Sequence, residues 1–458
     1  MKKYLGLVIL LSCISSWLAA GESYCFRVYL KDKGDSGYTL DQPEAFLSKE
    51  SIQRREKTGT PVSVSDLPIA RSYLDTLVSA GAEPVVQSKW FSTVVVTSRD
   101  STIADRLKEL AIVDSVKWVW KGSNVVTAEE AEQEERFFPA ETPLKDRYGY
   151  AGEQIKMLNG VKLHEAGFQG EGMRVAVIDA GFQNVDRISV FDSLKLIGTH
   201  NVVYPGQSVY NADDHGTKVL SCLAADMPGI MVGTAPKASY LLIKSEDSDS
   251  EYPIEEDYWA AAVEYADSVG VDVITSSLGY FAFDADELSY DQSALDGKTT
   301  LISQAAHMAA QKGILMFCSA GNEGNGIWGK ITFPSDASDV LTVGAITEEK
   351  KKSIFSSVGF TADYRVKPDV VALGSGSCVI DPKGNVRYAS GTSFATPILA
   401  GLGVCLWQAL PRLSNKDIID LLHQVSSQSK RPDAELGYGI PNMYKAYKKG
   451  LQYARTEH

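Results

Sequence analysis

The chain has 458 residues and a formal net charge of −13, from 45 basic and 58 acidic side chains. With 44% hydrophobic and 22% charged residues, a chain of this length can bury a large core and hold more than one domain. The acidic balance argues against the basic surface that nucleic-acid binding requires, so we expect no nucleic-acid partner.

The first 21 residues have the features of a signal peptide. Lys2-Lys3 precede an apolar stretch at 4–18, which small residues follow at 19–21. We therefore expect a signal peptide at 1–21 and a protein that is secreted, periplasmic or held at the cell surface. The segment ending at Cys13 weakly matches a lipoprotein box, so we expect membrane attachment only if Cys13 is lipidated. No other stretch is predicted to span a bilayer.

Residues 22–122 have the element order of a small α+β domain. Alternating and β-branched runs predict strands at 24–30, 85–86, 91–97 and 113–120, and helices are predicted at 70–80 and 103–110. The order β-α-β-β-α-β is that of a ferredoxin-like fold. An extra segment at 43–57 carries Arg54 and Arg55. We expect these arginines on a solvated helix face, with a processing site as the alternative.

An acidic segment separates this domain from the rest of the chain. Residues 129–136 are mostly glutamate, and 137–143 break the helix-forming composition with aromatic residues and proline. A run of this kind is usually a solvated face or a flexible tether. We assign 123–150 as an acidic linker.

In the second part of the chain, a serine, an aspartate and a histidine lie in sequence contexts that are typical of nucleophilic catalysis. Ser393 lies where the turn Gly391-Thr392 becomes an apolar helix, Asp179 ends the apolar run 175–178, and His215 opens a helical run. A serine hydroxyl is a poor nucleophile unless a base removes its proton and a third group orients the base. Each residue alone is more often a cap, a turn or a surface group. The conjunction favours catalysis, because the other histidines have no comparable acid or nucleophile setting: His164, His200, His307, His423 and His458.

With Asn322 in Ser-Ala-Gly-Asn-Glu-Gly, these motifs resemble the subtilisin family of serine peptidases over roughly residues 150–448. The resemblance implies a catalytic triad of Asp179, His215 and Ser393, with Asn322 as oxyanion donor. It also implies an α/β fold with a parallel sheet in a three-layer peptidase domain at 151–448, before a C-terminal tail at 449–458. Supporting segments lie at 233–238, 277–279, 367–370 and 437–442.

The same resemblance implies a secreted serine endopeptidase made as a proenzyme, acting on protein or peptide substrates. Residues 22–122 would be its propeptide, a chaperone and intramolecular inhibitor, with cleavage between about Lys121 and Tyr150. The segments resembling the family's primary specificity pocket are Ser277, Leu278, Gly279, Ser319, Ala320 and Gly321. Departures from the family's usual residues are Ala180, Lys218, Leu373 and Phe394, none of which removes a catalytic group.

An apparent insertion follows the first of these pocket segments. It carries acidic and aromatic side chains, namely Phe281, Phe283, Asp284, Asp286, Glu287, Asp291 and Asp296. The sequence leaves three interpretations of this loop open. It is a rim of the cleft that favours basic or apolar substrate side chains, a Ca²⁺ site, or a solvated surface loop. No EF-hand spacing is present. The chemistry requires no cofactor, and a structural Ca²⁺ is left open.

Three other functions compete with this interpretation. A lipase-like α/β-hydrolase needs Gly-x-Ser-x-Gly with the serine before the histidine, and here Ser393 follows His215. A sedolisin-type peptidase would replace His215 by Glu and Asn322 by Asp. The third alternative is a non-catalytic or once-processed binding or chaperone protein on the same fold. Five cysteines beyond the signal give no disulfide framework, and we expect Cys222, Cys318 and Cys405 in the core.

Overall fold

The structure is a computed structural model that describes residues 22–123, 135–211 and 213–456. The predicted signal peptide, Cys13 and most of the acidic run lie outside the described residues. Export, lipidation and the tether therefore stay predictions.

The N-terminal domain is a four-stranded antiparallel sheet with strand order β2-β3-β1-β4. Its strands are β1 (Ser23–Leu30), β2 (Glu83–Ser88), β3 (Thr93–Ser98) and β4 (Val113–Gly122), and its helices are α1 (Lys49–Thr58), α2 (Arg71–Ser79) and α3 (Ile103–Lys108). The predicted α+β fold is confirmed, with α1 inserted between β1 and α2. Phe26, Val28 and Leu77 form a small core between the sheet and the helices α2 and α3.

The second domain is built on a seven-stranded parallel sheet with strand order β13-β12-β11-β10-β5-β9-β6. These strands are β5 (Arg174–Asp179), β6 (Lys195–Asn201), β9 (Ser239–Lys244), β10 (Val273–Ser276), β11 (Leu315–Ser319), β12 (Leu341–Ile346) and β13 (Val370–Leu373). On one side of β5 the chain first forms the edge strand β6 and then β9, which lies between them; on the other side β10, β11, β12 and β13 follow in chain order. In open parallel sheets, ligands bind at the carboxyl edge beside such a reversal of strand order.

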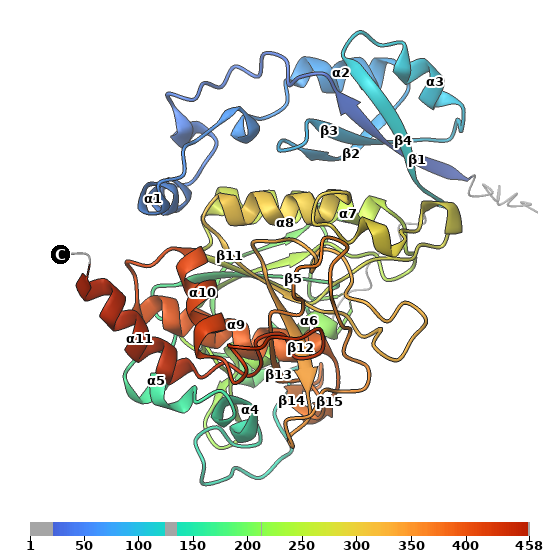
Figure 1. The fold of residues 1–458 in the computed structure, drawn as a ribbon. Helices are drawn as coiled ribbons and strands as arrows, with labels where there is room; N and C mark the ends of the chain where they lie inside the picture. Colours follow the sequence, from blue (N-terminus) through green and yellow to red (C-terminus); the bar gives the residue numbers. More distant parts are fainter. Residues whose placement is uncertain (1–21, 124–134, 212, 457–458) are drawn as a thin grey trace, which may run out of the picture.

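Helices cover both faces of this sheet, as Figure 1 shows. They are α4 (Gly152–Lys156), α5 (Val161–Glu165), α6 (His215–Ala224), α7 (Ile254–Val269), α8 (Leu301–Gln311), α9 (Thr392–Ala409), α10 (Asn415–Val425) and α11 (Met443–Thr456). Val175 and Val177 of β5 pack with α6 and α9, whereas Ala176 and Ile178 pack with α7 and α8. The sheet is thus buried on both faces, and the predicted three-layer α/β fold is confirmed. Small hairpins complete the domain: β7 (Asp226–Met227) with β8 (Met231–Val232), and β14 (Ser377–Ile380) with β15 (Val386–Ala389).

Helix α9 is long and apolar enough to cross a membrane by length and composition, contrary to the expectation that no stretch beyond the signal peptide would be. It is nevertheless 89% buried inside the fold. We therefore assign it as a core helix. The five cysteines of the described residues are free and buried, so Cys222, Cys318 and Cys405 lie in the core as predicted.

The N-terminal domain packs on the outer face of α7 and α8 (Figure 1). Cys25, Val95 and Val119 share one hydrophobic cluster with Trp259 of α7 and Ile302 of α8. The carboxylate of Glu264 on α7 accepts hydrogen bonds from the backbone N–H groups of two residues after β2, at positions 89 and 90. The two domains therefore share one continuous interior.

The prediction that Arg54 and Arg55 lie on a solvated helix face is wrong. A processing site has to be exposed to a peptidase, so the burial of both arginines also argues against that alternative. Arg54 and Arg55 are 4% and 2% exposed. Both guanidinium groups bind Asp267 near the end of α7, Arg55 at 2.6 Å, and Arg54 also donates to the Val271 carbonyl at 2.6 Å. Composition could not reveal this burial, because the partner carboxylate is more than 200 residues away.

Candidate active site

Four predicted residues come together where the sheet's carboxyl edge meets two helix starts. Asp179 is the last residue of β5, and Asn322 follows shortly after β11. His215 is the first residue of α6, and Ser393 is the second residue of α9. Because parallel strands end at a common edge, the topology brings together side chains that are far apart in sequence.

Asp179 and His215 form a short hydrogen bond. His215 Nδ1 lies 2.7 Å from Asp179 Oδ1, which also accepts the Ala180 N–H at 2.9 Å. Asp179 is fully buried, and its Oδ2 has no partner among the described residues. Burial disfavours the charged imidazolium, but the charge of Asp179 and its hydrogen bond outweigh burial and raise the pKa of His215 to about 9.

Ser393 is held by the backbone of a neighbouring strand end. Its Oγ donates to the Ser277 carbonyl at 3.3 Å, and Ser277 Oγ donates to the Ser393 carbonyl at 2.9 Å. Ser393 and His215 line one cavity of about 600 Å³. Between these two described side chains there is no hydrogen bond in this arrangement. Such catalytic hydrogen bonds often tighten only when substrate is bound.

The side chain of Asn322 is oriented by Thr392. Asn322 Oδ1 accepts hydrogen bonds from the Thr392 backbone N–H at 2.9 Å and from Thr392 Oγ1 at 3.0 Å. With its oxygen held in this way, the Asn322 amide nitrogen is left as a donor beside Ser393 on the cavity wall. The preceding Gly321 has a φ of 99°, a conformation that favours glycine, so the turn before Asn322 suits that residue.

The predicted pocket segments form the cavity wall, with one exception. Ser277, Leu278, Gly279, Ser319 and Gly321 line the cavity. Ala320 is fully buried behind them, and its N–H donates to the Val343 carbonyl. Its role is therefore packing beneath the wall, because no surface of it faces the cavity.

The acidic and aromatic insertion divides into two parts. Phe281 and Asp284 line the cavity, and the Phe281 ring stacks on Trp328 with ring centroids 4.7 Å apart. Asp291 and Asp296 instead accept hydrogen bonds from backbone N–H groups within two or three residues of themselves. These two carboxylates shape the loop locally and do not converge on a common point for Ca²⁺.

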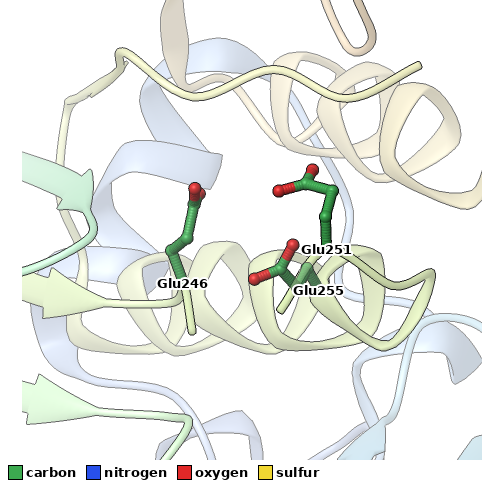
Figure 2. Close-up of side chains that lie close together, drawn as sticks. All are labelled: Glu246, Glu251 and Glu255. Carbon is green, nitrogen blue, oxygen red and sulfur yellow. The ribbon is translucent and has the colours of Figure 1, made fainter. Parts of the chain in front are cut away.

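Sequence reasoning missed a group of three glutamates beside the cavity, of which Glu246 and Glu251 line it. Glu246, Glu251 and Glu255 place carboxylate oxygens within 4.8 Å of one another, and Figure 2 shows the three side chains together. Burial, followed by mutual repulsion, raises the pKa of Glu251 to about 8 and of Glu255 to about 11. Burial and the nearby Asp179 raise the pKa of Glu246 to about 7, against a hydrogen bond from Tyr280.

Two histidines outside the cavity have acidic partners that the sequence did not indicate. His307 Nδ1 lies 2.9 Å from Asp339, and His423 Nε2 lies 3.2 Å from Asp369. Neither histidine is among the residues that line the cavity with Ser393. The sequence did not indicate these two acids, because the pairs form only in the fold.

Comparison with known proteins agrees with this geometry. Residues 170–439, more than half of the chain, match the subtilase family (peptidase S8), and residues 25–136 match the peptidase S8 propeptide domain of Bacteroidota. The chain therefore belongs to the subtilase family, as the motifs indicated. The N-terminal domain corresponds to the matched propeptide region.

Curated relatives cover different shares of the chain. Minor extracellular protease Epr of Bacillus subtilis is 24% identical over 388 residues, which are 84% of this chain and 54% of Epr. Subtilisin DY of Bacillus licheniformis is 29% identical over 279 residues, 60% of this chain and 90% of that protein. Subtilisin E of Bacillus subtilis is 28% identical over 279 residues, 60% of this chain and 65% of that protein. The chain thus spans about half of Epr's length and nearly all of subtilisin DY.

Proposed function

We propose that this protein is an exported serine endopeptidase made as a proenzyme, which hydrolyses peptide bonds through Asp179, His215 and Ser393. The observation that carries the proposal is the convergence of three chain segments on one cavity. There the buried Asp179 holds His215 at 2.7 Å, and Ser393 and Asn322 share the wall. Export is supported by the sequence of residues 1–21 and by relatives whose printed names include an extracellular protease.

In the proposed reaction, Ser393 Oγ attacks the peptide carbonyl carbon while His215 Nε2 accepts the serine proton. Asp179 binds the other ring nitrogen, so it fixes the tautomer with Nε2 unprotonated and stabilises the imidazolium that forms. His215 then gives the proton to the leaving amine nitrogen as the C–N bond breaks. A water molecule, deprotonated by His215, hydrolyses the resulting ester to release Ser393.

Negative charge on the former carbonyl oxygen needs donors fixed in advance. The Asn322 amide nitrogen and the backbone N–H of Ser393 are the two donors that we propose. The N–H groups of the first helical turn have no partner within the helix, so that of Ser393 is available at the start of α9. Prearranged donors of this kind stabilise the transition state because they cost no reorganisation.

Substrate binding is proposed along the segment from Ser277 to Gly279. This segment leaves β10 and borders the cavity, so an extended substrate can pair with its backbone as an added strand. A Cβ at Gly279 would lie 2.2 Å from Thr332 Oγ1, so close packing requires glycine at this position.

We propose that the N-terminal domain inhibits the enzyme until it is cleaved and released. It covers α7 and α8, and the end of β4 reaches the cavity rim, where Trp120 Nε1 donates to Ser250 Oγ at 3.2 Å. We propose that the propeptide occupies the cleft from this rim. Cleavage between about Lys121 and Tyr150 would then separate propeptide from enzyme.

Maturation of the purified full chain tests the proposal. The parent chain should convert into two fragments whose new N-terminus, read by mass spectrometry, lies between residues 121 and 150. Ser393→Ala should remain a single chain under the same conditions. Conversion of Ser393→Ala at the parent's rate would contradict self-processing. A parent that neither converts nor hydrolyses peptides would favour the binding-protein alternative.

A further inference from the structure

The three glutamates beside the cavity come from one stretch of chain that folds back on itself. Glu246 follows β9, Glu251 lies in the loop after it, and Glu255 is in the first turn of α7. Their carboxylate oxygens lie within 4.8 Å of one another (Figure 2). Like charges at this separation repel, and a cation between them would relieve that repulsion.

Glu255 supplies a second, independent indication of a ligand. Its side chain is 0% exposed, and its Oε2 has no hydrogen-bond partner, while Oε1 accepts the backbone N–H of Asp247 at 2.9 Å. A buried carboxylate oxygen without a partner is costly unless something binds it. In Figure 2 this carboxylate lies beside those of Glu246 and Glu251.

The nearest basic side chain does not neutralise the group. The Lys244 ammonium donates to the backbone carbonyls of Ala180, at 2.7 Å, and of Glu246. Among the described residues, none of the three glutamates forms an ion pair with a lysine, arginine or histidine at salt-bridge distance. Within the part of the chain that the structure describes, the only side-chain donor bound to the group is the Tyr280 hydroxyl, which donates to Glu246 at 3.0 Å.

We propose that Glu246, Glu251 and Glu255 bind a divalent cation, Ca²⁺, beside the catalytic cleft. Ca²⁺ takes oxygen ligands at about 2.3–2.6 Å, so two ligands on opposite sides of one ion lie about 4.8 Å apart, within which all three carboxylates already fall. A divalent ion also supplies more positive charge to a group of three carboxylates than one substrate lysine or arginine does, and its binding would displace the protons that these carboxyls otherwise hold. The buried position of Glu255 favours a small ion, since it is not among the residues that line the cavity.

The ion would join one wall of the cleft to the helix that carries the N-terminal domain. Asp247, Ser250 and Glu251 line the cavity, whereas Glu255 belongs to α7. Bound Ca²⁺ would therefore fix the wall that faces the substrate. This site shares no residue with Asp179, His215 and Ser393, so a loss of calcium binding can be distinguished from a failure of the proposed peptide hydrolysis.

The test measures metal binding to the intact chain, made as Ser393→Ala to keep it unprocessed. Calcium titration calorimetry and Tb³⁺ luminescence, sensitised through Tyr280, would be compared for this chain and for the same chain carrying Glu255→Gln or Glu251→Gln. Glu287→Gln is the matched control, since Glu287 lies in the neighbouring acidic insertion but outside the cluster. Circular dichroism would establish that each variant is folded.

Glu255→Gln should either lose one Ca²⁺ that the parent binds or bind that Ca²⁺ at least ~10-fold more weakly, because calcium affinity depends on the number of charged ligands. Glu287→Gln should bind Ca²⁺ as the parent does. Glu251→Gln should weaken the same ion. The proposal is overturned if both cluster variants bind Ca²⁺ and Tb³⁺ as the parent does, or if the parent shows no saturable binding. A further measurement uses Glu251→Gln and Glu255→Gln in the chain that keeps Ser393. The proposal is equally overturned if these enzymes lose only their preference for basic peptides, because the carboxylates would then be a substrate subsite.

Discussion

Ser277 and Ser393 exchange two hydrogen bonds in the wall of the cavity. Ser277 Oγ donates to the Ser393 carbonyl at 2.9 Å, and Ser393 Oγ donates to the Ser277 carbonyl at 3.3 Å. The first bond ties the start of α9 to the end of β10. The proposed nucleophile and the segment proposed to pair with substrate are thus fixed to each other.

Ser277→Ala should therefore impair catalysis without removing any reacting group. The variant loses the donor to the Ser393 carbonyl, a bond worth about 0.5–1.5 kcal/mol, so we expect kcat/KM to fall about 3-fold to 10-fold. Steady-state hydrolysis of a chromogenic peptide measures this change. Ser248→Ala is the control, because Ser248 also lines the cavity but does not bond to Ser393. Equal rates for the two variants would argue against the positioning role.

Asn322→Ala should slow turnover much more than it weakens binding. In the subtilisin family the loss of this oxyanion donor costs about 10²–10³ in kcat, and the backbone N–H of Ser393 remains. Thr392→Val removes one of the two bonds that orient Asn322. It should lower kcat by a smaller factor with KM nearly unchanged. An Asn322→Ala enzyme with the parent's kcat would exclude Asn322 from the reaction.

Activity should rise with pH through the titration of His215. Only neutral His215 can accept the serine proton, and Asp179 raises the pKa of the imidazole to about 9. Activity is therefore lost as pH falls through this pKa. A profile of kcat/KM between about pH 5 and pH 10 should show its acidic limb above the ordinary histidine value of about 6.5. A limb at or below that value would contradict the proposed effect of Asp179.

Asp179→Asn provides a separate test of the same pair. The amide carries no charge to stabilise the imidazolium, so the pKa of His215 should fall. An asparagine can also hold the ring in the wrong tautomer, which costs about 10⁴ in kcat in serine peptidases. The peptide assay measures the rate, and NMR of the imidazole measures the pKa. Loss of less than about tenfold in kcat would count against the triad.

Arg54→Ala should weaken retention of the propeptide after cleavage. It leaves Asp267 with one of its two buried arginine partners, and breaking a buried pair typically costs about 3–5 kcal/mol. Arg71→Ala is the matched control in the same domain, because the Arg71–Asp75 pair is exposed and such pairs contribute about 0–1 kcal/mol. Activity should therefore appear sooner after maturation only in Arg54→Ala. Once the propeptide is gone, both enzymes should have the parent's kcat/KM.

Indistinguishable delays for Arg54→Ala and Arg71→Ala would mean that α1 does not hold the propeptide. Co-purification of the cleaved propeptide with the enzyme gives a second readout. It should be lower in Arg54→Ala and unchanged in Arg71→Ala.

Local sequence signals predicted the elements that carry the reaction. Asp179 closes a buried apolar strand, and Ser393 follows a glycine turn at the start of an apolar helix, so each position is defined by its neighbours. Edge strand β6 has only a short apolar run, Leu196-Ile197, followed by glycine and polar residues, so the sequence gives little sign of a strand there. Helix α10 was also missed, although Ser414 and Asp417 form a capping box before its apolar face.

Long-range pairing explains the rest of what the sequence could not show. Arg54 and Asp267 meet only because the N-terminal domain docks on α7. Glu246, Glu251 and Glu255 converge only because the chain reverses between β9 and α7. In each case, charged residues that look like solvated surface in the sequence are partly or fully buried by tertiary contacts.

Covalent labelling by a serine-directed fluorophosphonate tests the central claim most directly. The reagent reacts only with a serine that an adjacent base activates, so it reports the nucleophile without requiring knowledge of the substrate. The matured protein should gain one label, mapped to Ser393 by peptide mass spectrometry, and lose the ability to hydrolyse peptides in proportion. Ser393→Ala should gain none. Matured protein that stays unlabelled, or that carries its label on another serine while losing activity, would contradict the account.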